Sequence, residues 1–198
     1  MVTLVVLMAA GLGYVAATGL SAREEPGALE SRVARAVRRL AVPGAARARP
    51  NPLPPTPDHL EEGLAHFADH CATCHANDGS ANTDVGRGLF PRPPDMRQPA
   101  TQELSDGELF YVIEHGVRFT GMPAFGNQSQ DGEESSWRLV HVIRRLPSLT
   151  PAELERMEGL NPRPPDAIRR ELEEERFLAG EDAAERGKME TGHTGEHE

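Results

Sequence analysis

Cysteine and aromatic residues are scarce in this sequence. Two of its 198 residues are cysteine and 5% are aromatic, whereas 19 are glycine and 17 are proline. A chain with so few large side chains and so many turn-forming residues is expected to form one small, loop-rich domain with appended segments, which fits better than two full hydrophobic cores. Because there is no second pair of cysteines, a zinc site built from two cysteine pairs is excluded.

Positive charge is also lacking over most of the chain. The formal net charge is −10, made up of +4 over residues 1–55, −8 over residues 56–165 and −6 over residues 166–198. The acidic central region argues against nucleic acid as a partner. It indicates either a partner protein with a basic docking surface or a contribution to solubility alone, and both explanations stay open.

An apolar run opens the chain. It extends from Val2 to Leu20, and no charged residue precedes Arg23. At the rise of an α-helix this run crosses most of a hydrocarbon layer, so residues 1–22 are predicted to be a membrane anchor or a signal segment. Residues 19–21 offer a cleavage site, but the run lacks the basic leader of a cleaved signal, which favours a retained transmembrane helix.

Residues 23–55 are predicted to be a basic helix followed by a proline-rich linker. Apolar residues recur at helical spacing with arginines between them, at Leu29, Val33, Val37 and Leu40. This pattern fits a helix on an anionic membrane surface, but it favours a solvated spacer, because basic amphipathic stretches are common and non-specific. Pro43 and Gly44 end the helix, and the prolines of residues 50–55 predict a stiff, extended linker.

Residues 56–150 show the pattern of a small all-α domain. Thr56 can cap a helix whose first residue is Pro57, and the glycine at position 63 predicts a close approach by another helix. Ser105 and Glu108 form a capping box for a second helix that ends at Gly116. A similar box over residues 131–134 is expected to start a last helix, apolar on more than one side, that ends before Pro147.

The two cysteines lie in Cys71-Ala72-Thr73-Cys74-His75. This CxxCH spacing is typical of covalent haem attachment, with each thiol bound to one vinyl group and the histidine directed at the iron. A disulfide, a redox-active pair and half of a zinc site are the alternatives, but no βαβ pattern or second ligand pair accompanies them.

Met122 lies in a Gly/Pro loop, Gly121-Met122-Pro123-Ala124-Phe125, after the second predicted helix. Its thioether suits the sixth position of a low-spin haem iron. A methionine that only fills the core is the alternative. His115 is the best substitute ligand because it lies in the same stretch of chain, and the other histidines of the domain are expected to be surface or packing residues.

Over residues 56–147 the sequence resembles the bacterial class I monohaem cytochromes c, because CxxCH and a downstream Met-Pro loop occur in the family's order. The resemblance implies that Cys71 and Cys74 form the thioether links to one haem c, that His75 is the proximal ligand and that Met122 is the distal ligand. It also implies that the proline-bearing loop of residues 89–94 supplies a carbonyl to the other nitrogen of the ligand histidine. One departure is His141, where the last helix of the family often has tyrosine.

The resemblance further implies one-electron transfer and not catalysis, because a haem iron with six ligands has no place for a small-molecule substrate. Haem attachment in bacteria takes place outside the cytoplasmic membrane, which implies a periplasmic location, anchored or released. The arginines after residue 22 favour the cytoplasmic side instead. Redox proteins of a respiratory chain are the expected partners, and the alternatives are a haem subunit of a larger membrane oxidoreductase and an open-site haem protein that binds a diatomic gas or peroxide.

Residues 151–198 are predicted to be a charged helical extension and a disordered acidic tail. Residues 166–178 show the pattern of a charged helix with three large apolar residues on or near one side. The histidines and carboxylates of residues 192–198 are expected to belong to the disordered terminus rather than to a metal site.

Overall fold

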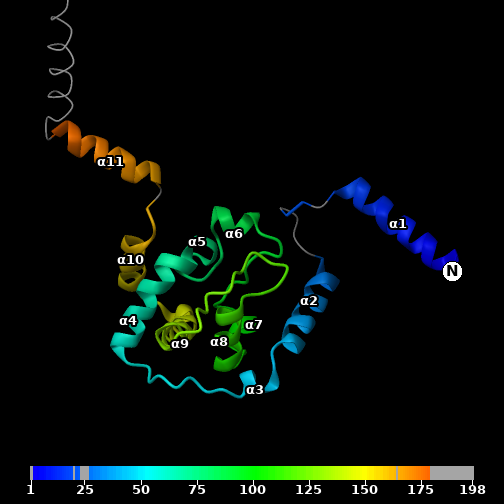
Figure 1. The fold of residues 1–198 in the computed structure, drawn as a ribbon, viewed down its shortest axis with the longest axis horizontal. Coiled ribbons are helices and arrows are strands. Elements are labelled where there is room, and N and C mark those ends of the chain that lie inside the picture. Colours follow the sequence, from blue (N-terminus) through cyan, green and yellow to red (C-terminus); the bar gives the residue numbers. More distant parts are fainter. Residues whose placement is uncertain (1, 20, 23–26, 164, 179–198) are drawn as a thin grey trace, which may run out of the picture. The chain divides into compact units, whose positions relative to one another are not determined.

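α-Helices, with one π-helical and one 3₁₀ turn, form all the regular structure in the computed structural model, which describes residues 2–19, 21–22, 27–163 and 165–178. No β-strand occurs in that part of the chain, so the all-α prediction is confirmed. The chain divides into one unit that extends to Asn161 and a second unit that begins at Pro162. Figure 1 shows the helices in chain order.

The N-terminal apolar run forms helix α1 (Val2–Thr18), which ends two residues earlier than the predicted run. None of the helices within the described ranges is both long enough and apolar enough to cross a membrane. The prediction of a transmembrane helix is therefore not supported.

The first helix of the domain begins where the sequence predicts. The hydroxyl of Thr56 accepts a hydrogen bond of 3.2 Å from the amide of His59, and Pro57 is the first residue of α4 (Pro57–His66). The helix continues through a π-helical turn, η1 (Phe67–Cys71), into α5 (Ala72–His75). π-Helical turns occur mainly within α-helices at functional sites, and this one leads directly into the CxxCH motif.

Of the two later helices of the domain, one begins at its predicted cap and the other does not. α8 (Asp106–His115) begins with the predicted box of Ser105 and Glu108, and Gly116 follows it with φ +63°. α9 (Gln130–Arg145) begins earlier than predicted, because the hydroxyl of Ser129 accepts from the amide of Gly132. The expected capping box over residues 131–134 is therefore wrong.

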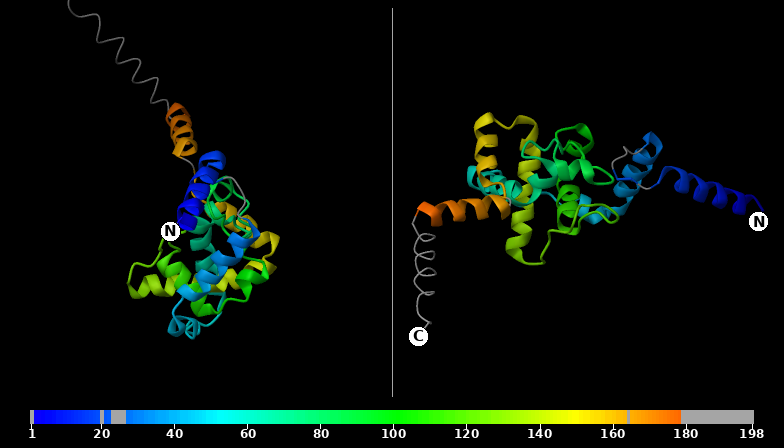
Figure 2. Two further views of the ribbon diagram at one scale, coloured as in Figure 1. Left: turned by 90° about the vertical axis from the view of Figure 1, so that its right-hand side faces the viewer. Right: turned by 90° about the horizontal axis from the view of Figure 1, so that it is seen from above.

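The core forms where α9 packs against α4 and α8 (Figures 1 and 2). A β-carbon at Gly63 of α4 would lie 2.9 Å from the carbonyl oxygen of Arg138 and 2.8 Å from a methyl group of Val142. The close approach predicted at Gly63 is confirmed. The rings of Phe110 and Trp137 stack in the same core with centroids 4.0 Å apart.

Residues 46–53, which we call the strap, contact the domain although the sequence predicts an extended linker there. They begin in the second half of the short helix α3 (Gly44–Arg47). The guanidinium of Arg49 lies 4.7 Å from the ring centroid of Phe110, a cation–π distance. Asn51 donates a hydrogen bond of 3.0 Å to the carbonyl of Trp137, and its side chain lies 3.2 Å from Nε2 of His141. His141, the departure from the resembled family, thus contacts the strap.

The packed unit also includes α10 (Pro151–Leu160), which lies beyond the predicted domain end at residue 150. Met157 is 1% exposed and belongs to the core. Burial of the Glu153 carboxyl alone raises its pKa, but hydrogen bonds from Arg145 and Thr150 outweigh this effect and hold the pKa at about 2. The ion pair of Glu153 with Arg145 joins α10 to the end of α9.

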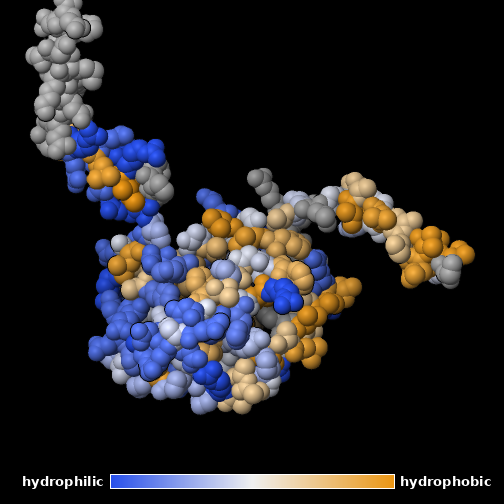
Figure 3. Space-filling view, viewed as in Figure 1, coloured by the Kyte–Doolittle hydropathy of each residue, from blue (hydrophilic) through white to orange (hydrophobic). Residues whose placement is uncertain are grey.

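The second unit contains α11 (Pro165–Leu178), and the predicted helix over residues 166–178 agrees with it. Its large apolar side chains are exposed among charged ones, and Figure 3 shows them as an orange stripe on a blue helix. Arg163 donates to the carboxylate of Glu171 at 2.6 Å. The predicted disordered tail over residues 179–198, with its histidines, lies outside the described residues.

Candidate functional site

One apolar pocket brings together the four residues that the sequence singles out. Cys71, Cys74, His75 and Met122 all line it. Most of the remaining lining is aliphatic or aromatic and comes from α8, from α9 and from the loops on either side of α8, including Met96, Leu109, Val112, Ile113, Phe125 and Ile143. The pocket therefore combines two thiols, one imidazole and one thioether with a surface that favours an apolar ligand.

His75 is held in its neutral form. Burial lowers the pKa of its imidazole to about 4, so the ring carries no charge at neutral pH. Its Nδ1 atom is buried and has no hydrogen-bond partner. The prediction that a carbonyl of residues 89–94 accepts from this ring is not confirmed, although Pro91, Pro93 and Pro94 line the same pocket. A neutral imidazole is the form that binds a metal.

The two cysteines are free and both thiols are protonated at neutral pH. Burial raises the pKa of Cys71 to about 12, with a further contribution from Cys74 close by. Burial also raises the pKa of Cys74. Both thiols line the apolar pocket, so a group bound there lies beside them.

Backbone carbonyls of the CxxCH motif are fixed by the loop that follows it. The amide of Ala81 donates to the carbonyl of His75 at 2.8 Å, and the hydroxyl of Thr83 donates to the carbonyl of Cys74 at 3.3 Å. Thr83 also caps the short helix α6 (Asp84–Gly88), where a β-carbon at Gly86 would lie 2.5 Å from the Cys74 carbonyl. These contacts fix the backbone at the C-terminal end of the motif.

The methionine loop is tightly constructed. The amide of Val117 donates to the carbonyl of Met122 at 3.1 Å, and the amide of Met122 donates to the hydroxyl of Thr120 at 3.1 Å. A β-carbon at Gly116 would lie 2.6 Å from the backbone of Pro123, and one at Gly121 would lie 2.6 Å from the Leu89 side chain. These two glycines let the loop fold back over the pocket and contact the proline-bearing loop opposite.

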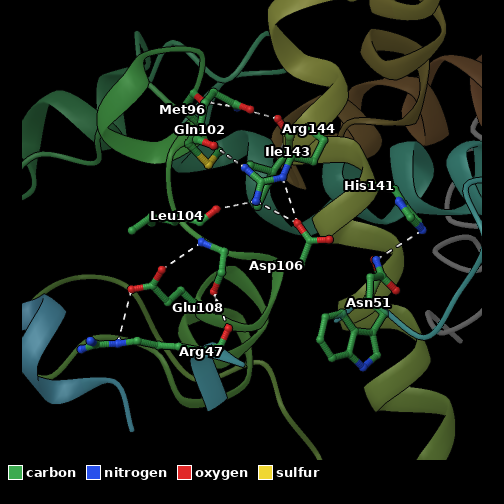
Figure 4. A network of polar contacts seen from close by, with 12 residues as sticks. Arg47, Asn51, Met96, Gln102, Leu104, Asp106, Glu108, His141, Ile143 and Arg144 are labelled. Carbon is green, nitrogen blue, oxygen red and sulfur yellow. Dashed lines mark hydrogen bonds and ion pairs between the residues drawn. The ribbon is translucent and has the colours of Figure 1, made fainter. Parts of the chain in front are cut away.

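A polar network behind the pocket wall holds its lining in place (Figure 4). The side-chain amide of Gln102, at the end of α7 (Pro99–Gln102), donates to the carbonyls of Met96 and Ile143 at 2.7 and 2.8 Å. The guanidinium of Arg144 donates to the carbonyl of Leu104 and to Asp106. Because Met96, Leu104 and Ile143 line the pocket, this network fixes the wall from its polar side. No pattern in the sequence predicts this polar network.

The other histidines of the domain lie in different settings. His115, the substitute ligand suggested by the sequence, is exposed and packs on Tyr111 with ring centroids 4.3 Å apart. His66 lies 2.6 Å from the Ser135 hydroxyl. His59 and His141 contact backbone carbonyls of the segment before α4. Only His70 joins His75 at the pocket within the described chain, and it is paired with Asp69 at 3.1 Å.

A haem fits the donor set of this pocket. Two thiols at CxxCH spacing, an apolar lining and a neutral imidazole with an unpartnered buried nitrogen match the requirements of a covalently attached porphyrin. Met122 supplies a thioether sulfur to the same pocket. In the part of the chain that the structure describes, no group of three or more His, Cys, Asp or Glu residues forms a separate metal site.

Comparison with known proteins agrees with this geometry. Residues 58–141 match the family described as cytochrome C oxidase, cbb3-type, subunit III. No curated protein matches the chain. The match begins one residue after the start of α4 and ends within α9, so it includes the CxxCH motif, the methionine loop and the packed helices. The folded domain of this chain is a monohaem c-type cytochrome domain, with one haem c attached covalently at the motif of Cys71 and Cys74.

Proposed function

We propose that this chain is an electron-transfer protein that passes single electrons through haem c, with His75 and Met122 as the two axial ligands of the iron. The observation that carries this proposal is that both cysteines, His75 and Met122 line one apolar pocket. The haem supplies reversible one-electron redox chemistry when bound. The protein would hold the haem, supply the ligands of its iron and exclude water from the pocket.

His75 and Met122 have different roles in the proposed haem site. His75 is neutral at physiological pH, so its Nε2 lone pair is available without the loss of a proton. Hydrogen bonds within the loop of residues 116–123 fix the backbone of Met122, and a methionine ligand raises the reduction potential. If His75 and Met122 both held the iron, no position would be open for a small-molecule substrate, which would favour a carrier over an enzyme.

The proposed location is the periplasmic side of the bacterial cytoplasmic membrane. Covalent haem attachment supports export, because in the resembled bacterial family it takes place outside that membrane. The exposed apolar side chains of α1 support a role of this helix in membrane targeting. The proposed partners are redox proteins of a respiratory chain.

A second candidate is a fixed haem subunit of a larger oxidase. The family match favours it, since the matching family is described as a subunit of a cbb3-type cytochrome c oxidase. Gentle solubilisation of membranes from the native host distinguishes the two. A fixed subunit co-purifies with its oxidase at constant stoichiometry through successive columns, whereas a carrier separates from it.

Substitution of Met122 tests the ligand assignment. In haem-loaded Met122→Leu the sixth ligand is lost, so we expect high-spin absorption, rapid carbon monoxide binding by the reduced protein, and a fall in potential on the order of 0.1 V, within the ~0.8 V range that axial ligands set. Met157→Leu is the matched control, because this buried methionine lies in the core and does not line the pocket. It should leave spectrum and potential unchanged.

Carbon monoxide also tests the open-site alternative. Rapid and complete binding by the unmodified reduced protein, unaltered by Met122→Leu, would contradict the carrier proposal and support a haem protein that binds a diatomic gas. Slow or negligible binding by the unmodified protein supports two protein ligands.

A further inference from the structure

Helix α2 (Ala28–Ala41) presents an unpartnered apolar side. Leu29, Val33, Val37 and Leu40 are exposed by 75%, 53%, 57% and 82%. At 100° per residue these four positions fall within about 80° of the helix circumference, so they form one continuous side. Four large apolar side chains left exposed on one side of a helix indicate that something covers them in the working protein.

Helix α2 is also basic. It contains four arginines and one acid, Glu30, for a net charge of +3 within a chain whose total is −10. The arginines occupy positions 32, 35, 38 and 39, which the helical step places between about 100° and 160° away from the middle of the apolar side, beyond one of its edges and opposite it. A basic helix with one apolar side is the arrangement of helices that lie in the interface of an anionic membrane.

We propose that α2 binds flat on the surface of a bilayer that contains anionic lipid, with its apolar side among the headgroups and its arginines on the lipid phosphates. The charge of α2 supports this occupant, because anionic lipid attracts a helix with a net charge of +3. The exposed apolar side chains of α11 lie on a helix with a net charge of −2, which anionic lipid repels, so α11 serves as the comparison. α2 also follows α1, whose apolar side chains are exposed along the helix (Figure 3). The proposal does not depend on the electron-transfer function.

Vesicle flotation with the full-length, haem-loaded protein tests the proposal. One set of vesicles is phosphatidylcholine and the other contains added phosphatidylglycerol, and the haem absorption reports bound protein. We expect tighter binding to the anionic vesicles and a loss of that difference as salt rises. Arg32→Gln with Arg35→Gln should weaken binding to the anionic vesicles about thirty-fold, from ~1 kcal/mol for each arginine.

Two further variants separate the lipid from other occupants. Val33→Ser with Val37→Ser retains all charges and should weaken binding to both kinds of vesicle, because it removes apolar area from α2. Arg169→Gln with Arg170→Gln removes the same charge from α11 and should change nothing. Equal binding of the unmodified protein to both vesicles overturns the proposal, as does an equal effect of the α11 and α2 arginine variants.

A protein occupant would show itself in the same measurement. If α2 instead pairs with a second copy of the chain, the α2 variants alter the oligomeric state in the absence of lipid. If it pairs with α11, they alter the elution volume and its dependence on salt. In both cases the variants leave flotation with vesicles unchanged. That result also overturns the proposal.

Discussion

The α4–α9 interface and the haem pocket belong to one domain but differ in what completes their packing. At the interface the protein's own side chains fill the apolar contact, because Gly63 lets the α9 backbone approach and the Trp137 and Phe110 rings stack beside it, although the buried Nε1 of Trp137 has no hydrogen-bond partner. At the pocket the protein supplies aliphatic walls and leaves the buried Nδ1 of His75 without a partner. The first region should depend little on haem, whereas the second requires it.

The glycines of the two regions permit different contacts. Gly63 serves helix packing, whereas Gly116 and Gly121 let the methionine loop fold onto neighbouring loops. A substitution at the interface is therefore expected to destabilise the protein with or without haem. A substitution at the pocket is expected to act on haem retention, spectrum or potential.

The largest expected effect follows from loss of both thiols. Cys71→Ala with Cys74→Ala, produced in a host competent for haem attachment, should lose covalent haem completely, and its intact mass should equal that of the bare polypeptide. Thr73→Ala is the matched control, because Thr73 lies between the cysteines and is exposed. It should retain the haem mass. Covalent haem in the double variant would contradict the assignment of the motif.

The second-largest effect is expected at Glu153, in the contact between α10 and the end of α9. Its folded-state pKa of about 2 is lower than its ordinary value of 4.5, so its contribution to stability is present above pH 4.5 and is lost as pH falls toward 2. Glu153→Gln should lower the free energy of unfolding at pH 7 by about 2–3 kcal/mol. It should also flatten the acid limb of the stability curve.

Chemical denaturation at a series of pH values measures this change. Exposed Glu155 in the same helix provides the control, since Glu155→Gln should change neither the midpoint nor its pH dependence. An unchanged acid limb in Glu153→Gln would show that the ion pair with Arg145 does not stabilise the attachment of α10.

A smaller effect is expected at Gly63. Gly63→Ala adds a β-carbon within 3 Å of the Arg138 carbonyl, and despite the better helix propensity of alanine it should cost about 1–2 kcal/mol in both haem-free and haem-loaded protein. Gly159→Ala in α10 is the control, because nothing lies within 4 Å of its added carbon, and it should stabilise by about 0.5–1 kcal/mol. If the Gly63 effect disappears when haem is bound, the proposed contrast between the two regions is wrong.

Local signals in the sequence predicted much of this domain. The caps at Thr56 and Ser105, the helix end at Gly116 and the close approach at Gly63 each depend on residues a few positions apart or on the absence of a side chain. The CxxCH motif predicted the attachment site for the same reason. The α9 cap was wrong because two signals compete there, and the hydroxyl of Ser129 is the one that caps.

Contacts between distant residues were not predictable in this way. The strap joins Asn51 to residues more than 80 positions away, and its prolines alone indicate only an extended segment. α10 has a single deeply buried apolar residue, Met157, so its sequence shows no strong helical periodicity. Gln102 and Arg144 act on backbone carbonyls, which leave no residue pattern to read.

The strap also limits how far the haem domain can travel from α2. A free linker over residues 42–55 in an extended proline-rich conformation would reach about 43 Å, at ~3.1 Å per residue. With residues 46–53 held against α8 and α9, only residues 42–45 separate α2 from the domain, a distance of at most about 14 Å. If α2 lies on a membrane surface as proposed, a redox partner of this domain would have to meet it close to that surface, because the strap keeps the domain within this distance of α2.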